Sequence, residues 1–377
     1  MPSPVKDTEP AGAGQIPGNV EQDRLVQSGM ELSMANRCGS YLQVDQDVIQ
    51  SACTQDGIEV LPIKKALEKY SWLADYRWKL VPKDKDEITK YVAAQPDPKG
   101  YVIIAKKGTS NLFPIQACLY LGREQIQHVH NIIIAEEGAE LHIISGCTSG
   151  HSVGKGGAHY GISEFYVGKN AKISFTMIHN WSEEIEVFPR SASQVEENGV
   201  FLSNYVCMQP VRKVQMYPTA NLVGDNSVAR FSSVVIATPG SYLDVGSRAI
   251  LGGKGASAEL ITRAITQGGT IMSRGHIQGK VAGSRGHLEC KGLILKDGLI
   301  YAVPEIEGLV VGTELSHEAA VGKLARDEIE YLMARGLDEE VATATIIRGF
   351  LDVKIAGLPA ALQQQIDAAI DTAESGF

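Results

Sequence analysis

Short segments in which apolar and polar side chains alternate fill the middle of the chain. After Gly100 they include residues 101–104, 131–134 and 172–178, and Gly, Asn or Asp residues bound each of them. Alternation with a period of two is typical of β-strands. No amphipathic helical pattern interrupts the strands before about residue 316. The pattern therefore predicts an all-β core over residues 100–315.

Turn residues recur at a nearly constant interval in the second half of this region. The interval separates Gly224, Gly240, Gly255, Gly269 and Gly283. A short period without crossover helices indicates stacked β-coils, each of which buries its inward side chains against its neighbours. A β-sandwich also gives short strands with turn signals. The regular spacing favours the solenoid, a parallel β-helix with these glycines at or next to its corners.

Helical regions are expected on both sides of the β core. Residues 1–29 are rich in Pro and Gly and are expected to be a disordered leader. Residues 30–99 are expected to be an N-terminal helical region with a helix start at Pro62. The Pro62 position suits the first turn of a helix because proline has no N–H to donate.

The C-terminal part, residues 316–377, is expected to be a helical domain of three helices. Ser316 is a plausible N-cap with Glu318 in the first turn, and Gly336 suits the end of the first helix. Asp338 can cap the second helix, and an Ala-rich third helix is expected over residues 358–373.

Composition excludes several classes of protein. The chain has 377 residues, of which 44% are hydrophobic and 21% charged, and its net charge is -9. Nucleic-acid binding needs clustered basic residues, so no nucleic-acid partner is expected. The N-terminus lacks the basic start and apolar stretch of a signal peptide, and no apolar stretch is long enough to cross a membrane. We therefore expect a cytoplasmic protein with no membrane partner, whose six cysteines are free thiols.

The sequence lacks complete forms of the common catalytic motifs. Two Gly-Lys segments, at Lys155 and Lys254, lack the Ser or Thr that a P-loop requires after the lysine. His128 and His130 have the spacing of two ligands on one strand face, without a third ligand nearby. Neither a GxSxG elbow nor an HExxH helix occurs in the sequence. The sequence therefore predicts a protein that is not an enzyme.

Cys290 lies among polar residues near the end of the predicted β core, and Glu318 follows it where the C-terminal helices are expected to begin. One thiolate with a carboxylate or imidazole is a sparse ligand set, suited to holding an iron–sulfur cluster loosely, because tightly held clusters usually take four thiolates. A buried cysteine and a carboxylate at a helix start are the alternative. From the residues alone, that alternative is favoured.

The C-terminal stretch from Ser316 to Phe350 resembles the signature of the SufB/SufD family of iron–sulfur cluster assembly proteins. That signature reads roughly His-Glu-Ala-Ser, an acidic residue before Tyr-Leu, Arg-Gly-Ile/Leu and a closing Gly-Phe. The resemblance extends over about residues 100–352, through Asn180-Trp181, Tyr217-Pro218, Gly224-Asp225 and Cys290, and the region 58–80 is similar to the N-terminal part of compact members.

The resemblance implies a right-handed parallel β-helix and a scaffold that assembles a transient iron–sulfur cluster and transfers it to apo-proteins. It implies an ABC-type ATPase partner (SufC) on the C-terminal helices, with cluster assembly at the interface with a second copy or a SufD-like paralogue. His317-Glu318-Ala319 and Cys290 are similar to SufB, so the resemblance implies Cys290 and Glu318 as cluster ligands. Cys147, His287 and His317 are further candidate ligands.

We expect the ATPase contact on the second C-terminal helix, where Ile346, Ile347, Phe350 and Leu351 form an apolar surface. Longer SufB proteins have a cysteine in the segment that corresponds to residues 190–204, and that cysteine is thought to accept sulfur. This chain has no cysteine there, so the resemblance does not identify the residue that accepts sulfur. A SufD-like structural partner without cluster chemistry is the alternative function. A polysaccharide-active β-helix enzyme is disfavoured, because only 6% of the residues are aromatic.

Overall fold

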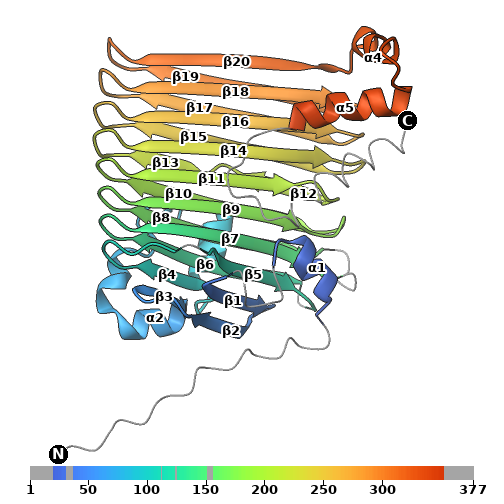
Figure 1. The fold of residues 1–377 in the computed structure, drawn as a ribbon. Helices are drawn as coiled ribbons and strands as arrows, with labels where there is room; N and C mark the ends of the chain where they lie inside the picture. The colour runs from blue at the N-terminus through green and yellow to red at the C-terminus, as the bar shows by residue number, and fades with distance from the viewer. Residues whose placement is uncertain (1–19, 31–36, 112, 124, 151–155, 352–377) are drawn as a thin grey trace, which may run out of the picture.

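Two long sheets stand face to face and form a parallel β-helix with short helices at both ends (Figure 1). The structure is a computed structural model, and it describes residues 20–30, 37–111, 113–123, 125–150 and 156–351. Successive strands along the column alternate between the two sheets, so each pair of strands makes one coil. The prediction of an all-β solenoid is confirmed.

Sheet A is parallel except for its first pair. In spatial order it contains β2 (Asp47–Cys53), β1 (Gly39–Val44), β5 (Ile115–Leu121), β7 (Glu140–Ser149), β9 (Lys172–Asn180), β11 (Val200–Cys207), β14 (Val228–Ala237), β16 (Ser257–Thr266), β18 (Arg285–Ile294) and β20 (Glu314–Lys323).

Sheet B faces sheet A and is likewise parallel after its first pair. In spatial order it contains β3 (Ile58–Pro62), β4 (Tyr101–Ala105), β6 (Ile126–Ala135), β8 (Ala158–Val167), β10 (Glu186–Val195), β12 (Lys213–Met216) with β13 (Thr219–Leu222) beside it, β15 (Tyr242–Leu251), β17 (Thr270–Gly279) and β19 (Leu299–Gly308).

The strand register gives the repeat of the coils. Val228 pairs with Ser257, Ser257 with Arg285 and Arg285 with Glu314, so the same position recurs once in every coil. The interval between the glycines in the sequence is about half of this repeat, because it spans one strand and one turn whereas a coil has two of each. All five of these glycines lie in turns between strands, as predicted.

Glycines turn the chain at the corners for two different reasons. Gly240 has a φ of 85°, which glycine adopts more easily than other residues. At Gly224 the reason is space, because a β-carbon there would overlap the backbone of the coil below.

Asparagines form a second kind of corner. Asn170, Asn198 and Asn226 have φ values of 56°, 54° and 54° and lie above one another in successive coils. The side chain of Asn198 donates to Asn170 over 3.0 Å, and that of Asn226 donates to Asn198 over 3.4 Å. Asparagine tolerates this conformation and stacks, so the ladder fixes the corner.

The core is a continuous column between the sheets. Phenylalanines from the two sheets meet in it at steep angles, with ring centroids of Phe165 and Phe175 4.8 Å apart and those of Phe165 and Phe201 5.0 Å apart. Inward positions alternate with outward ones along each strand, so each strand contributes every second side chain to the column.

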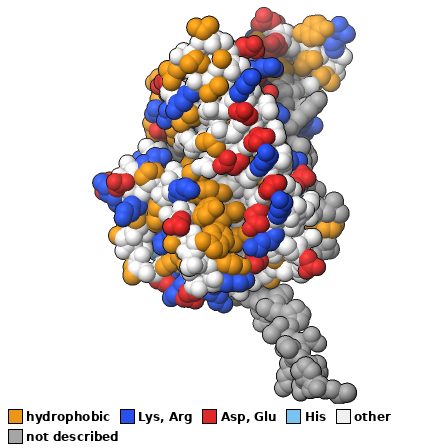
Figure 2. All heavy atoms as spheres, turned by 90° about the vertical axis from the view of Figure 1, so that its left-hand side faces the viewer, with side chains coloured by type: hydrophobic (Ala, Val, Ile, Leu, Met, Phe, Trp, Pro, Cys, Tyr) orange, Lys and Arg blue, Asp and Glu red, His pale blue; other side chains and the backbone are white. Residues whose placement is uncertain are grey.

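Charged side chains cover the turns that lead from sheet B into sheet A. Figure 2 shows acidic and basic groups alternating down this face. Lys107 Nζ lies 2.8 Å from Glu137, and Lys169 Nζ lies 2.7 Å from Glu197. Exposed pairs of this kind contribute little stability each.

Short helices lie near both ends of the solenoid. They are α1 (Gln22–Gln27), α2 (Ile63–Lys69), the 3-10 helix η1 (Ser71–Asp75), α3 (Glu87–Ala93), α4 (Arg326–Met333) and α5 (Glu339–Leu351). Helix α2 starts directly after Pro62, as predicted.

Buried Glu164 on β8 links the N-terminal region to the solenoid. Its carboxylate accepts hydrogen bonds from the backbone N–H groups of Trp78 and Leu80 and lies 2.7 Å from His130 Nε2.

The expectation of a helical region over residues 30–99 is correct only from Ile63 onward. Residues 39–62 instead form β1, β2 and β3. They do so because β1 pairs with β5 and extends sheet A, and β3 pairs with β4 and extends sheet B. Helix α1 lies inside the expected leader, where Leu25 packs beside Cys118 and Tyr120. The rest of the leader, residues 1–19, lies outside the described residues.

The expected helix start at Ser316 is also wrong. Residues 314–323 form β20, which pairs with β18 along its whole length, and the first C-terminal helix starts only at Arg326. The parallel ladder provides partners along the whole strand, which outweighs the local capping signal of Ser316. Gly336, with a φ of 97°, follows this first helix as predicted. The expected third helix, residues 358–373, lies outside the described residues.

Among the described helices, none combines the length and the apolar character needed to cross a membrane.

Candidate metal-binding coil

Strands β18 and β20 place the predicted ligands on two different faces. Glu289 pairs with Glu318 in the ladder, and Cys290 pairs with Ala319. Because successive side chains of a strand point to opposite faces, Cys290 faces the core, whereas Glu289 and Glu318 face outward. Cys290 is 2% exposed, and the Glu318 side chain is 56% exposed. Within one chain, the structure does not bring Cys290 and Glu318 together.

Cys290 belongs to the apolar core of the solenoid. Burial raises the pKa of its thiol, so the thiol is protonated at neutral pH. Ala319, in the last strand of sheet A, lies beside it in the ladder. His317 pairs with Leu288 and so belongs to the same inward row as Cys290, but it is exposed because no further described coil follows β20. Cys290 therefore lies one strand away from the open end of the solenoid.

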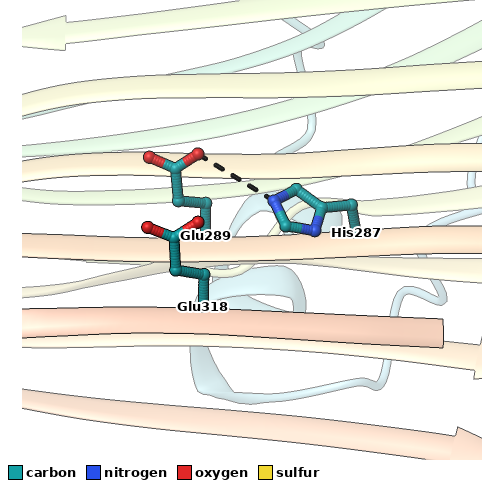
Figure 3. A group of neighbouring side chains, drawn as sticks. All are labelled: His287, Glu289 and Glu318. Atoms are coloured by element: carbon teal, nitrogen blue, oxygen red, sulfur yellow. Dashed lines mark ion pairs between the residues drawn. The ribbon is translucent and has the colours of Figure 1, made fainter.

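Three side chains with metal-binding atoms meet on the outer face of the same two strands. His287, Glu289 and Glu318 each offer one ligand atom, and these atoms lie within 4.8 Å of one another (Figure 3). His287 Nε2 is 3.9 Å from Glu289 Oε2, and its Nδ1 is 2.8 Å from the hydroxyl of Ser316. Imidazole and carboxylate oxygen together suit a divalent ion such as Fe²⁺.

Two basic side chains occupy this cluster. Lys291 Nζ lies 3.0 Å from Glu289 Oε1 and 3.0 Å from Glu318 Oε1, and an Arg263 guanidinium nitrogen lies 2.5 Å from Glu289. Burial opposes ionisation of Glu289, but hydrogen bonds and charges from Lys291 and Arg263 outweigh it and lower the pKa of Glu289. The two carboxylates are thus balanced by two cations. A divalent ion would have to displace Lys291 to bind here.

Cys147 lies far from this coil. It is on β7, and four strands of sheet A separate β7 from β18, a distance of about 24 Å at the usual strand spacing. Its side chain is 2% exposed, and burial raises the pKa of its thiol. It lines a cavity of about 40 Å³ inside the solenoid together with His159, His179 and Tyr205. Cys147 and Cys290 therefore cannot bind one cluster within a single chain.

The predicted partner-binding residues on α5 lie mostly against the solenoid. Ile347 and Leu351 are 1% and 3% exposed and pack on an apolar strip of the outer face of sheet A, with Phe350 at its border. Ile346 is half-buried. Helix α5 lies along that face in Figure 1. The large apolar side chains that the α4–α5 hairpin exposes are Tyr331 and Val341, at 59% and 46%.

Sequence reasoning did not find Glu289, Lys291 or Arg263. The sequence does contain a pattern that could have found two of them. Polar residues at every second position, His287, Glu289 and Lys291, indicate that these side chains share the outward face of a strand. The place of Glu318 beside Glu289 was not predictable, because it depends on residues 314–323 forming a strand in register with β18.

The structure is a parallel β-helix that carries, on β18 and β20, a thiol on the inner face and imidazole and carboxylate groups on the outer face that could hold a metal ion. Residues 119–350 match the family described as "SUF system FeS cluster assembly, SufBD core domain". The chain belongs to the SufBD family of iron–sulfur cluster assembly proteins.

Relatives match nearly the whole chain. An iron–sulfur cluster assembly SufBD family protein of Archaeoglobus fulgidus is 51% identical over 356 residues, covering 94% of this chain and 95% of the relative. One from Methanothermobacter thermautotrophicus is 45% identical over 371 residues, covering 97% and 90%. One from Pyrococcus horikoshii is 30% identical over 346 residues, covering 90% and 77%.

Proposed function

We propose that this protein is a cytoplasmic scaffold on which a transient iron–sulfur cluster is assembled and from which it is transferred to apo-proteins. The observation that carries the proposal is the cluster of His287, Glu289 and Glu318 on the outer face of β18 and β20, with the Cys290 thiol on the inner face of the same two strands, in a member of this family. The protein would have no catalytic activity of its own, and ATP hydrolysis would reside in its partner.

Cys290 and Glu318 are the proposed cluster ligands, with His287 and His317 as further donors and Cys147 as a more remote one. Since Cys290 faces inward and Glu318 outward, a shared cluster requires one of two events. Either β20 separates from β18 and uncovers the thiol, or a second subunit supplies part of the ligand set. Incomplete ligation with mixed donors would leave the cluster labile, which transfer to another protein requires.

The proposed partner is an ABC-type ATPase of the SufC type, bound to the α4–α5 hairpin. Strand β20 ends at Lys323 and α4 begins at Arg326, so a force on the hairpin would act on β20 almost directly. ATP-driven movement of the hairpin would therefore loosen the strand that covers Cys290. Tyr331 and Val341 are the apolar side chains that the hairpin offers to a partner.

A second subunit, either another copy or a SufD-like paralogue, would pair with the open end. The turn between β19 and β20 exposes Leu309, Val310 and Val311 at 59%, 39% and 98%, and Tyr301 on β19 is 50% exposed. Adjacent exposed apolar side chains next to an unpaired strand edge favour association. Figure 2 shows hydrophobic atoms at this end of the molecule.

One observation favours the alternative function, a SufD-like structural partner without its own cluster. The Cys290 thiol is buried and protonated, and the outer carboxylates are already paired with Lys291 and Arg263. Such a protein would contribute shape and a dimer surface, and a separate scaffold would provide the cluster ligands.

Anaerobic reconstitution with iron and sulfide separates the two functions. The scaffold function requires that the purified chain, alone or with the ATPase, binds iron and sulfide in equal amounts and gives the absorbance and Mössbauer spectra of a cluster. A chain that binds no cluster under either condition, but restores cluster formation on a paralogue, would be the structural partner.

A further inference from the structure

Two cysteines lie side by side at the N-terminal end of sheet A, far from the last coil. Cys38 directly precedes β1, and Cys53 is the last residue of β2, the neighbouring antiparallel strand. Gly39 pairs with Cys53, and the backbone N–H of Thr54 donates to the carbonyl of Cys38 over 2.8 Å. The backbones of the two cysteines are therefore neighbours joined by the ladder.

The two thiols lie close together although the strands alone would not place them so. Cys38 lies in a bend just before β1, so it does not follow the alternation of the strand, and its side chain forms a hydrogen bond with that of Cys53. Neighbouring positions of an antiparallel pair also bring α-carbons to about 6 Å, within the span of a disulfide. Gly39 leaves the space beside the Cys53 sulfur open, because a β-carbon at Gly39 would lie 3.3 Å from Cys53 Sγ. Both sulfurs belong to the same end of the core, where Cys53 packs against the cluster that contains Cys38.

The two thiols have unequal surroundings. Cys38 is 6% exposed, and the side-chain amide of Asn111 lies 3.6 Å from its sulfur, whereas Cys53 is half-buried. The hydrogen bond between the two thiols lowers the pKa of Cys53 to about 7, and the same bond together with burial raises the pKa of Cys38. By contrast, burial raises the pKa of the other four thiols, Cys118, Cys147, Cys207 and Cys290. An accessible thiolate beside a buried thiol is the arrangement of an attacking and a resolving cysteine.

We propose that Cys53 and Cys38 form a thiol exchange site that reduces S–S bonds of small sulfur compounds. The Cys53 thiolate attacks the S–S bond of a disulfide RSSR, forms a mixed disulfide and releases one thiolate RS⁻. Cys38 then gives up its proton, attacks the Cys53 sulfur and releases the second RS⁻. The disulfide gains two electrons and becomes two thiols, and the protein is oxidised to a Cys38–Cys53 disulfide.

A persulfide RSSH has the same kind of bond and gives a different product. Attack of Cys53 on the outer sulfur releases RS⁻ and leaves a persulfide on Cys53. Attack of Cys38 on the Cys53 sulfur then releases HS⁻ and closes the same disulfide. One persulfide and two protein thiols become one thiol, one sulfide and one disulfide. The persulfide reaction would supply sulfide for cluster assembly and in that respect rests on the proposed function, whereas the exchange site itself does not.

The test treats the full-length protein, anaerobically, with glutathione disulfide or with glutathione persulfide, followed by alkylation and mass spectrometry. With either compound we expect a Cys38–Cys53 disulfide in the natural protein. With the persulfide we also expect about one sulfide released per chain, by the stoichiometry of exchange. The variant Cys38→Ser should accumulate a mixed disulfide or a persulfide on Cys53, and Cys53→Ser should react at least 10-fold more slowly.

Cys118→Ser is the matched control, since it removes a buried thiol elsewhere in sheet A and should react like the natural protein. A disulfide formed with glutathione disulfide alone would assign the site to disulfides, and one formed with persulfide alone would assign it to persulfides. If neither compound links Cys38 to Cys53 while circular dichroism shows an intact fold, the proposal is overturned. Because no iron is added, this result does not depend on whether the chain binds a cluster.

Discussion

Cys290 and Glu318 lie on opposite faces of the same two-stranded ladder, one residue out of register. Cys290 pairs with Ala319, and Glu318 pairs with Glu289. The thiol is therefore inside the solenoid and the carboxylate outside, although both belong to the last two strands of sheet A. A cluster that uses both must form in a state in which β20 has moved or a second subunit takes part.

The first prediction concerns bound iron. Cys290→Ser and Glu318→Ala should each lower the iron bound per protomer after anaerobic reconstitution, whereas Cys147→Ser, about five strands away, should not. Iron and sulfide analysis with Mössbauer spectroscopy measures this. Full cluster loading in both of the first two variants, with the fold intact, would show that other residues are the ligands.

The sequence predicted the solenoid but not the neighbours of Glu318. Alternating polarity and regularly spaced glycines such as Gly240 reflect local geometry that repeats in every coil, so they can be read from one sequence. The strand over residues 314–323 could not be predicted from the sequence. Ser316 and Glu318 also fit a helix start, and the ladder with β18 is a long-range interaction. The same holds for β1, whose partner β5 is far away along the chain.

The second prediction concerns acid stability. The pKa of Glu289 is lowered in the folded protein from the ordinary 4.5, so its ionised form stabilises the fold above that pH. This stabilisation is lost as the pH falls through the lowered, folded-state pKa. Glu289→Gln should cost about 1 kcal/mol at pH 7 and less below pH 4, so that stability falls less steeply with acid than in the natural protein. Urea unfolding at pH 7, 5 and 3.5 measures this.

Glu314→Gln provides the control for that comparison. Its side chain also pairs with an arginine but is 75% exposed, so solvent screens the pair and the change in stability should be a few tenths of a kcal/mol. Equal effects of the two substitutions at every pH would contradict the role assigned to Lys291 and Arg263.

The third prediction concerns the asparagine ladder. Asn198 has a φ of 54°, which valine adopts only at a cost, and it bonds to Asn170 and Asn226. Asn198→Val should destabilise the protein by about 1–3 kcal/mol more than Asn198→Gly, because both lose the bonds but glycine accepts the conformation. Urea unfolding of the two variants gives the difference directly. Equal stabilities would mean that the corner relaxes to a negative φ.

The last prediction separates the two sides of helix α5. Ile347 is buried against the strands, so Ile347→Ala should lower the free energy of unfolding by about 2–5 kcal/mol. Tyr331→Ala and Val341→Asp change exposed positions of the α4–α5 hairpin and should alter stability by less than about 0.5 kcal/mol. If the hairpin binds the ATPase, these two variants should lose binding by at least 10-fold in a pull-down titration, whereas folded Ile347→Ala should retain it. Loss of binding in Ile347→Ala alone would assign the contact to the surface around Ile347 that the sequence pattern predicts. Binding retained by every variant would place the ATPase elsewhere on the chain.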